Sequence, residues 1–179
     1  ISYNFISSEY DVLVSAGEQI SCALISGRLN HLGHKSQSWM SWQIPILTEG
    51  PYNSSRIIKI NKRKINNYLK SGGIPIIAGF QGVNSQNRIT TLGRGGSDTT
   101  AVALAVATKS NCCEIFTDVE GIFSSDPRIV KKAKKIKKIT YEEILEMSSA
   151  GSKVLHPRSV ELAMKYGIKI HVRSSFTSK

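Results

Sequence analysis

A glycine-rich segment at residues 92–98, Leu-Gly-Arg-Gly-Gly-Ser-Asp, contains the residue types with the clearest chemical use. It runs directly into an alanine-rich apolar stretch that predicts a helix. Glycines let a backbone fold closely around an anion, and the free N–H groups at a helix start would point into the same space. The segment therefore predicts a phosphate-binding loop in which Gly95 and Gly96 offer backbone and Arg94 a cation. A simple tight turn is the alternative use of such glycines.

Two later segments place further polar residues next to predicted strands and helices. Residues 117–128 begin with Thr117 and Asp118 at the carboxyl end of an apolar strand, which is where ligands bind open α/β sheets. Residues 153–158, Lys-Val-Leu-His-Pro-Arg, lie between two helical patterns. Phosphoryl transfer requires positioning and charge neutralisation rather than covalent chemistry, and the glycine loop and Lys153 would supply both.

The order and spacing of these three segments resemble the aspartokinase branch of the amino-acid kinase family. A fourth segment, Ser-Ala-Gly-Glu at residues 15–18, is similar to that family's substrate-carboxylate region, so the resemblance covers almost the whole chain. It implies an α/β three-layer sandwich with a mainly parallel central sheet, as in carbamate kinase. It also implies ATP-dependent phosphorylation of L-aspartate to 4-phospho-L-aspartate, the first step toward lysine, threonine and methionine, with Mg²⁺ bridging the phosphates.

The resemblance also implies a role for individual residues. Lys153 and Asp98 would be catalytic, with Asp98 orienting lysines or the substrate amino group. Glu18, Arg94 and Asp98 would bind the substrate. The nucleotide would contact Gly95, Gly96, Thr117, Asp118, Phe123, Arg128, Lys153 and Val154. Phe123 replaces a tyrosine common at its position, which keeps a stacking face but loses a hydroxyl, and no residue is assigned as a metal ligand.

Each of these residues also has a structural interpretation. Asp98 could cap the following helix, and Glu18 could be a first-turn glutamate favoured by the helix dipole. Arg94 could be a surface residue, and Asp126 could form a turn before proline. His156, a single histidine before proline, is interpreted as structural and left out of the site.

Two features of the family are absent from this sequence: the opening Lys-Phe-Gly-Gly strand and the C-terminal ACT-type domains. We therefore expect residues 1–179 to be an N-terminally incomplete catalytic domain, weak or inactive alone. A non-catalytic nucleotide-binding or regulatory remnant is one alternative. A related kinase of N-acetylglutamate, glutamate or uridylate is another, although Ser-x-Gly-Glu together with Lys-Val-Leu-His-Pro-Arg favours aspartate.

Composition limits the other classes of function. The chain is 40% hydrophobic, enough for one core, and it lacks the roughly 18 consecutive apolar residues of a membrane span. Three cysteines without metal-site spacing indicate reduced thiols and a cytoplasmic protein. The net charge of +11 and six lysines within residues 131–138 could attract nucleic acid. That run has no aromatic residue, so we interpret it as a solvated connector and expect no nucleic-acid partner, no membrane partner and, for the full-length protein, a homo-oligomer.

Strand and helix patterns alternate along the chain, which favours a mainly parallel sheet covered by helices. A strand end is predicted at 11–14, followed by an amphipathic helix at 18–29 with Ile20, Ala23, Leu24 and Gly27 on one face. Further strands are predicted at 44–47, 56–60, 74–78, 112–117 and 168–172, with a hairpin at 79–91. Helices are predicted at 61–69, 97–109, 141–148 and 157–166.

Overall fold

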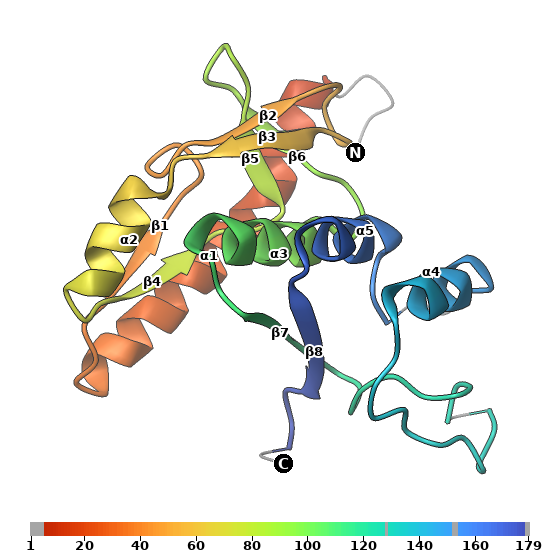
Figure 1. The fold of residues 1–179 in the computed structure, drawn as a ribbon. Helices are drawn as coiled ribbons and strands as arrows, with labels where there is room; N and C mark the ends of the chain where they lie inside the picture. The colour runs from red at the N-terminus through yellow and green to blue at the C-terminus, as the bar shows by residue number, and fades with distance from the viewer. Residues whose placement is uncertain (1–5, 128, 152–153, 178–179) are drawn as a thin grey trace.

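A computed structural model of the chain describes residues 6–127, 129–151 and 154–177. Helices and strands alternate along it, which confirms an α/β sandwich (Figure 1). The helices are α1 (Ser7–His31), α2 (Lys62–Lys70), α3 (Gly96–Thr108), α4 (Tyr141–Ser149) and α5 (Pro157–Tyr166). The strands are β1 (Ser36–Trp39), β2 (Ile46–Glu49), β3 (Arg56–Ile60), β4 (Ile74–Ile77), β5 (Gln81–Val83), β6 (Ile89–Thr91), β7 (Cys112–Thr117) and β8 (Lys169–Ser174).

The described strands form three sheets rather than one continuous sheet. β1 pairs with β4 in parallel, β7 pairs with β8 in parallel, and a mixed sheet has the order β3-β2-β5-β6. Within the mixed sheet, β2 and β5 are parallel while the β5–β6 hairpin is antiparallel, as predicted for residues 79–91. Parallel pairing therefore predominates, but the single central sheet that was expected is divided among the described strands.

α3 lies at the centre of the molecule and joins its parts (Figure 1). It contacts β3 and β5 of the mixed sheet on one side and β7 and α5 on the other. Its residues Val102 and Ala105 enter the larger hydrophobic core with Cys113 and Val160, whereas a smaller core surrounds Trp39, Ile44 and Ile65. The first residue of α3 is Gly96, so this central packing positions the glycine loop.

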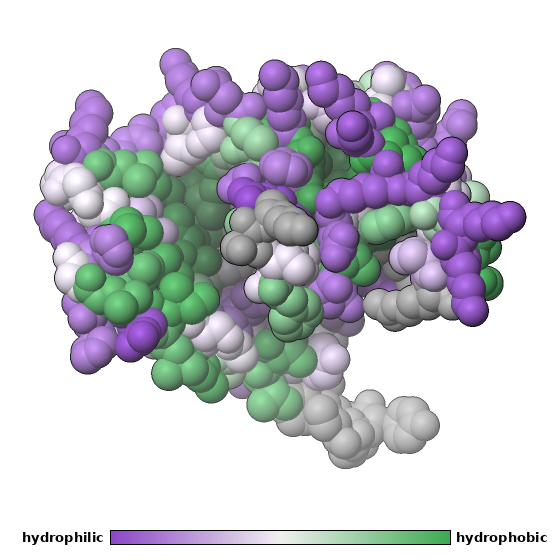
Figure 2. Space-filling model, turned by 90° about the horizontal axis from the view of Figure 1, so that it is seen from below, coloured by the Kyte–Doolittle hydropathy of each residue, from purple (hydrophilic) through white to green (hydrophobic). Residues whose placement is uncertain are grey.

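α1 contradicts two predictions made from the sequence. Residues 11–14 are helical rather than a strand end, because α1 begins at Ser7 and continues to His31. The apolar face expected to be buried is exposed: Ile20 is 61% and Leu24 is 69% accessible. A broad hydrophobic patch is visible on the side of the molecule where α1 lies (Figure 2). The buried residues of α1 are instead Asp11, Ser15, Cys22 and Ser26.

Two of these buried residues, Asp11 and Ser15, bind other parts of the chain. The Ser15 carbonyl accepts a hydrogen bond of 3.2 Å from Gln81 Nε2, and the Gln81 side-chain oxygen accepts one of 3.0 Å from Gln19 Nε2. Asp11 binds the end of β6. The polar face of α1 therefore faces the β5–β6 hairpin, and hydrogen bonding rather than apolar burial orients the helix.

Several element boundaries differ from the predictions by a few residues. β2 begins at Ile46 instead of Ile44, and β1 was not predicted. β7 and α5 match their predicted ranges, and α4 has a capping box in which Thr140 and Glu143 exchange hydrogen bonds. Within the described ranges, every helix is too short or too polar to cross a membrane.

Candidate functional site

The glycine loop turns the chain sharply before α3. Gly93 has φ +72° and Gly95 has φ +70°, a left-handed conformation that side-chain-bearing residues rarely adopt. Gly95 is the N-cap residue of α3, and no side chain from the described part of the protein caps this helix start. The Gly96 N–H donates to the Gly93 carbonyl at 3.0 Å, so within the described residues the N–H groups of Ser97 and Asp98 are the ones left for a ligand, as the predicted phosphate site requires.

Close packing also restricts two of these positions to glycine. A Cβ at Gly93 would lie 2.6 Å from the Asn53 carbonyl oxygen. A Cβ at Gly95 would fall on the side chain of His156, within 2.9 Å of its Cδ2. The segment containing His156 therefore covers the glycine loop, so two of the motifs found in the sequence are in contact.

An open cleft of about 580 Å³ lies between α1 and this loop. Its lining residues are Tyr10, Val14, Gly17, Glu18, Ser21, Asn53, Phe80 and 93–98. The predicted site residues Glu18, Arg94, Gly95, Gly96 and Asp98 all belong to it. Residues separated by up to eighty positions therefore meet in one cavity that combines two carboxyl groups, one guanidinium and a helix N-terminus.

Glu18 is held by a residue of the glycine loop. Ser97 Oγ donates a hydrogen bond of 2.9 Å to Glu18 Oε1. Glu18 lies in the middle of α1, so the predicted location near a helix start is wrong and the helix dipole does not explain this glutamate. Its carboxylate keeps further acceptor positions for a donor in the cleft.

Asp98 lies in the first turn of α3 with a perturbed carboxyl group. Partial burial raises its pKa above the ordinary aspartate value, and a hydrogen bond from the His156 backbone and the nearby imidazole oppose that shift. No side-chain cap is found at this helix start, so the capping interpretation of Asp98 is wrong. Perturbed carboxyl groups in clefts are frequent at functional sites.

Arg94 is the cation of the cleft. Its side chain is exposed, and it has no ion-pair or hydrogen-bond partner within the described ranges. An unpaired guanidinium next to a helix N-terminus can bind a carboxylate or a phosphate.

Gly95 and Gly96 line the first cleft, whereas the predicted nucleotide residues Thr117, Asp118 and Phe123 lie elsewhere, at or after the carboxyl end of β7. Thr117 Oγ1 donates to Asp118 Oδ1 at 3.1 Å, and Phe123 forms a backbone bridge with Lys135. A second hollow of about 470 Å³ is adjacent to this region and is lined by Glu120, Lys135, 171–174, Phe176 and Thr177. Thr117, Asp118 and Phe123 do not line the first cleft. Their role toward a nucleotide remains a prediction.

The structure leaves some predicted residues without a test. Lys153 and Arg128 lie outside the described residues. Val154 is described and packs against the larger hydrophobic core. His156 has the structural role expected from the sequence, because its Nδ1 accepts the Arg158 backbone N–H at 3.3 Å and caps α5.

The lysine-rich segment connects β7 to α4. Lys134 and Ile136 form backbone hydrogen bonds with residues 122–124, and its lysine side chains are exposed. The segment has the geometry of the predicted connector. The described residues contain no group of three histidine, cysteine, aspartate or glutamate side chains that could hold a metal ion.

Sequence reasoning missed several residues of the cleft, including Ser97, Asn53 and Phe80. Ser97 lies inside the glycine motif and was available as a signal. Phe80 has φ +66°, an unusual conformation for a bulky residue, and its O accepts the Leu92 backbone N–H at 2.9 Å. Asn53 and Phe80 line the cleft only because the fold brings their segments to it.

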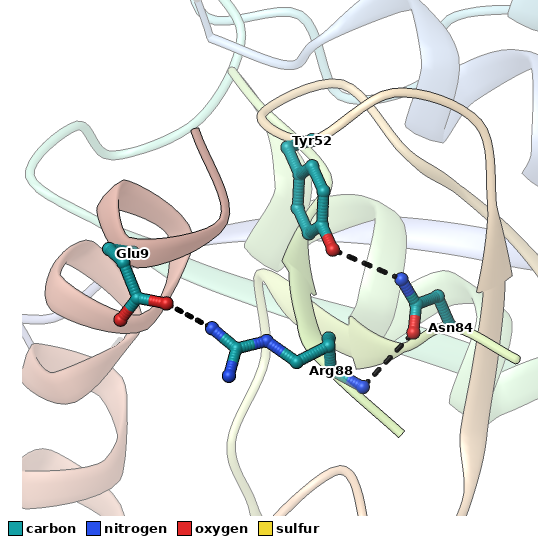
Figure 3. Close-up of polar contacts among 4 residues, drawn as sticks. All are labelled: Glu9, Tyr52, Asn84 and Arg88. Carbon is teal, nitrogen blue, oxygen red and sulfur yellow. Dashed lines mark hydrogen bonds and ion pairs between the residues drawn. The ribbon is translucent and has the colours of Figure 1, made fainter. Parts of the chain in front are cut away.

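Four polar residues, Glu9, Tyr52, Asn84 and Arg88, are joined by an ion pair and hydrogen bonds (Figure 3). Glu9 of α1 forms an ion pair with Arg88 of the β5–β6 hairpin. Asn84 accepts the Arg88 backbone N–H at 3.0 Å and its amide donates to the Tyr52 hydroxyl at 3.4 Å. The start of α1, the hairpin and the turn before Asn53 are thereby connected.

A glycine loop at a helix start, facing carboxyl and guanidinium groups in an α/β sandwich, defines the class of proteins that bind anionic ligands through backbone N–H groups, to which many phosphoryl-transfer enzymes belong. The chain belongs to the amino acid kinase family, because the sequence model of that family matches residues 3–174. The resemblance stated from the sequence motifs is thereby confirmed.

Individual relatives are aspartokinases. The chain is 51% identical over 178 residues to the aspartokinase of Rickettsia felis, covering 98% of this chain and 44% of that protein. It is 51% identical to the aspartokinase of Geobacillus stearothermophilus, covering 96% and 42% respectively. The chain therefore spans less than half the length of these curated relatives.

Solved structures show the same likeness. Escherichia coli aspartokinase III in complex with aspartate and ADP matches with a TM-score of 0.89 and 34% identity, covering 97% of this chain and 39% of that one. UMP kinase from Bacillus anthracis matches with a TM-score of 0.69 at 21% identity, which shows a common fold alone.

Proposed function

We propose that this chain provides substrate-binding and phosphoryl-transfer residues of an aspartokinase. A side-chain carboxylate oxygen of L-aspartate would form a bond to the γ-phosphorus of ATP while the bond to the β,γ-bridging oxygen breaks, giving 4-phospho-L-aspartate and ADP. The observation that carries the proposal is the convergence of Glu18, Arg94 and Asp98 in one cleft at the N-terminus of α3. Identity of about half to several aspartokinases supports aspartate as the substrate.

The charges of the cleft match those of an amino-acid substrate. Arg94 would pair with the α-carboxylate of aspartate, and the carboxylates of Glu18 and Asp98 would accept hydrogen bonds from its α-ammonium group. The free N–H groups at the start of α3 would face the developing charge on the transferred phosphoryl group. This arrangement positions the reactants and neutralises charge, which is what phosphoryl transfer requires.

The nucleotide is proposed to bind at the carboxyl end of β7, with Thr117, Asp118, Phe123 and Arg128 in contact, and with Lys153 and Val154 from the following segment. Lys153 would act on the transferring group as a catalytic cation. Mg²⁺ prefers phosphate oxygens with one or two carboxylates, and the cleft offers Glu18 and Asp98 without a dedicated cluster. The ion would therefore arrive with ATP and neutralise charge on its phosphates.

We also propose a cellular compartment and an oligomeric state for the full-length protein. Three free cysteines suit the cytoplasm, where thiols stay reduced and where aspartate enters lysine biosynthesis. The exposed apolar residues of α1, which include Ile20 and Leu24, support a homo-oligomer in the full-length protein. Light scattering across a concentration series would test the oligomer.

A turnover assay tests the proposal. The full-length protein is incubated with ATP, Mg²⁺ and L-aspartate, and the acyl phosphate is trapped with hydroxylamine as a hydroxamate. Hydroxamate formation with aspartate but not with N-acetylglutamate or glutamate is expected, and ADP release, which also reports phosphorylation of UMP, should stay at background with UMP. Nucleotide binding without turnover would indicate a non-catalytic remnant, and salt-sensitive nucleic-acid binding that ATP does not change would indicate a basic module.

A pair of arginine variants adds a matched control. Arg94→Gln removes the cation of the cleft, whereas Arg28→Gln removes an exposed arginine at the far end of α1. Both change the net charge equally. We expect Arg94→Gln to weaken aspartate binding by about 1.5–3 kcal/mol, the value of a hydrogen bond to a charged group, and Arg28→Gln to leave binding unchanged. Equal effects would mean that general electrostatic attraction, not the cleft, binds the substrate.

A further inference from the structure

Asp11 binds two chain segments at once from inside the protein. Its side chain is 0% exposed. Oδ2 accepts the backbone N–H of Thr91 at 2.7 Å and that of Asn53 at 3.0 Å, and Oδ1 accepts the Thr91 hydroxyl at 2.9 Å. The end of β6 and the turn after Tyr52 are therefore held against α1.

Arg158 of α5 binds the same two segments, one residue after Thr91 in the first and two residues after Asn53 in the second. Its Nη1 donates to the Leu92 carbonyl at 2.6 Å, and its Nη2 donates to the Ser55 carbonyl at 3.1 Å. The Ser55 backbone N–H donates to the Thr91 carbonyl at 3.0 Å and joins the segments directly. Residues 53–55 and 91–92 thus form a junction. The Asp11 carboxylate accepts hydrogen bonds from its backbone N–H groups, whereas the Arg158 guanidinium donates hydrogen bonds to its carbonyl groups.

The glycine loop begins at this junction. Gly93 follows Leu92 and packs on the Asn53 carbonyl, so the first turn of the loop rests on the segment held by Asp11. Arg158 lies two residues after His156, whose side chain covers Gly95. The loop is therefore fixed from α1 on one side and from α5 on the other.

The same contacts fix the distance between the loop and Glu18. Glu18 lies seven residues after Asp11 on α1, which is about two helical turns. A helix anchored to Thr91 through Asp11 keeps the Glu18 carboxylate within hydrogen-bonding distance of Ser97. Misplacement of the loop would separate Glu18 from Arg94 and Asp98.

Stability alone is a poor explanation for a carboxylate in this place. Asp11 has no ion-pair partner within the described residues, and burial of a carboxylate is unfavourable unless hydrogen bonds compensate. Three donors compensate here, and all three belong to the segments that precede the glycine loop.

We propose that Asp11 and Arg158 are positioning residues that form a latch around residues 53–55 and 91–92 and thereby set the geometry of the glycine loop. The expected effect of this latch on turnover rests on the proposed function, whereas its effect on the geometry of the loop does not. Neither Asp11 nor Arg158 lines the cleft. Loss of the Asp11 or the Arg158 side chain leaves Glu18, Arg94 and Asp98 present but shifts them relative to one another. A displacement of about 1 Å costs on the order of 100-fold in rate.

The primary test is amide hydrogen exchange of residues 92–97 in wild type, Asp11→Asn and Arg158→Gln, each at the same interval below its own melting temperature. A tenfold or greater acceleration confined to this segment and residues 53–55 is expected. Unchanged exchange there in both variants would overturn the latch. This readout requires no substrate, so it remains decisive if the wild type fails to phosphorylate aspartate and the proposed function falls.

A neighbouring pair of threonines supplies a control and a second variant. Thr91→Val removes the hydroxyl bound to Asp11, whereas Thr90→Val removes a buried hydroxyl bound to Thr48. Both residues are at most 1% exposed and adjacent on β6. Faster loop exchange in Thr91→Val but not in Thr90→Val supports the latch even if Asp11→Asn does not fold, and equal exchange refutes it.

Kinetics give the third readout in the full-length protein. We expect Asp11→Asn and Arg158→Gln to lower kcat/KM for aspartate by 10-fold to 100-fold, with Thr90→Val near wild type. Wild-type kcat/KM in both latch variants would show that the contacts are structural only.

Discussion

Replacing Gly95 with alanine tests whether the close contact between the glycine loop and His156 exists in solution. Gly95 has φ +70°, and a methyl group there would overlap the Cβ and ring of His156. The imidazole cannot move freely, because its Nδ1 accepts the Arg158 N–H and caps α5. The substitution therefore forces either a change of the loop or the loss of a helix cap.

The expected cost has two parts. Left-handed backbone costs an alanine about 1–2 kcal/mol relative to glycine. Overpacking against His156 adds about 1–3 kcal/mol, comparable to the loss of a helix cap. We expect the free energy of unfolding to fall by about 2–5 kcal/mol for Gly95→Ala.

Gly167→Ala separates the two parts. Gly167 ends α5 with φ +67°, and nothing lies within 4 Å of the position that its Cβ would occupy. This variant should lose only the backbone part, about 1–2 kcal/mol. Urea unfolding of both variants measures the difference directly. Equal losses would refute the close contact between Gly95 and His156.

The double variant Gly95→Ala, His156→Gly completes the test. Alanine at position 156 would keep the overlapping Cβ, so glycine is needed. Glycine at an N-cap costs only a few tenths of a kcal/mol relative to better caps. Adding His156→Gly to Gly95→Ala should therefore restore about 1–3 kcal/mol, a coupling that two independent sites would not show.

Three further results are expected. Glu18→Gln keeps an acceptor for Ser97 but loses its charge, so calorimetry should show aspartate binding weakened by about 1.5–3 kcal/mol with stability unchanged. Burial raises the pKa of Asp98 in the folded protein above its value in the unfolded chain. The contribution of the protonated carboxyl group to stability is therefore fully present below the unfolded-state pKa and is lost as the pH rises through the folded-state pKa. Denaturation at several pH values should therefore show Asp98→Asn gaining stability relative to wild type over that interval. Burial raises the pKa of the Cys113 thiol to about 11, so iodoacetamide at pH 8 should label the exposed Cys112 first by mass spectrometry.

The C-terminal half of the fold was predicted well because its signals are local. The strand Cys112–Thr117 alternates buried and exposed residues, and α5 starts at a proline and ends before a left-handed glycine. Apolar residues at strand and helix spacing also enter the core there, so pattern and packing agree.

α1 was predicted poorly because its pattern and its packing disagree. The apolar residues at 12–14 look like a strand, and those at 20–24 look like a core-facing stripe. The described structure instead buries Asp11 and Ser15, which bind residues of β5 and β6 far away in the sequence. A periodicity argument assigns apolar residues to the interior and has no means of recognising a polar face that will find distant hydrogen-bond partners.

The candidate site divides in the same way. Glu18, Arg94 and Asp98 were predicted because their types and motif context carry chemical meaning, and they do meet in one cleft. Asp11 and Arg158 were not predicted as site residues, because their partners are 42 to 103 positions away and are mostly backbone atoms. Backbone partners leave no signature in the residue types of a sequence.

The polar side chains that α1 buries are related to the way in which the glycine loop is supported. The Gly96 N–H at the start of α3 already donates to the Gly93 carbonyl within the loop, and the Ser97 and Asp98 N–H groups, if they are to bind a ligand, cannot support the loop as well. Its support has to come from the residues before it, and those backbone groups require buried acceptors and donors. Asp11 and Arg158 meet that need on opposite sides, at the expense of an apolar face on α1 that points outward. The support that Asp11 gives to the residues before the glycine loop therefore explains why α1 buries a carboxylate at this position.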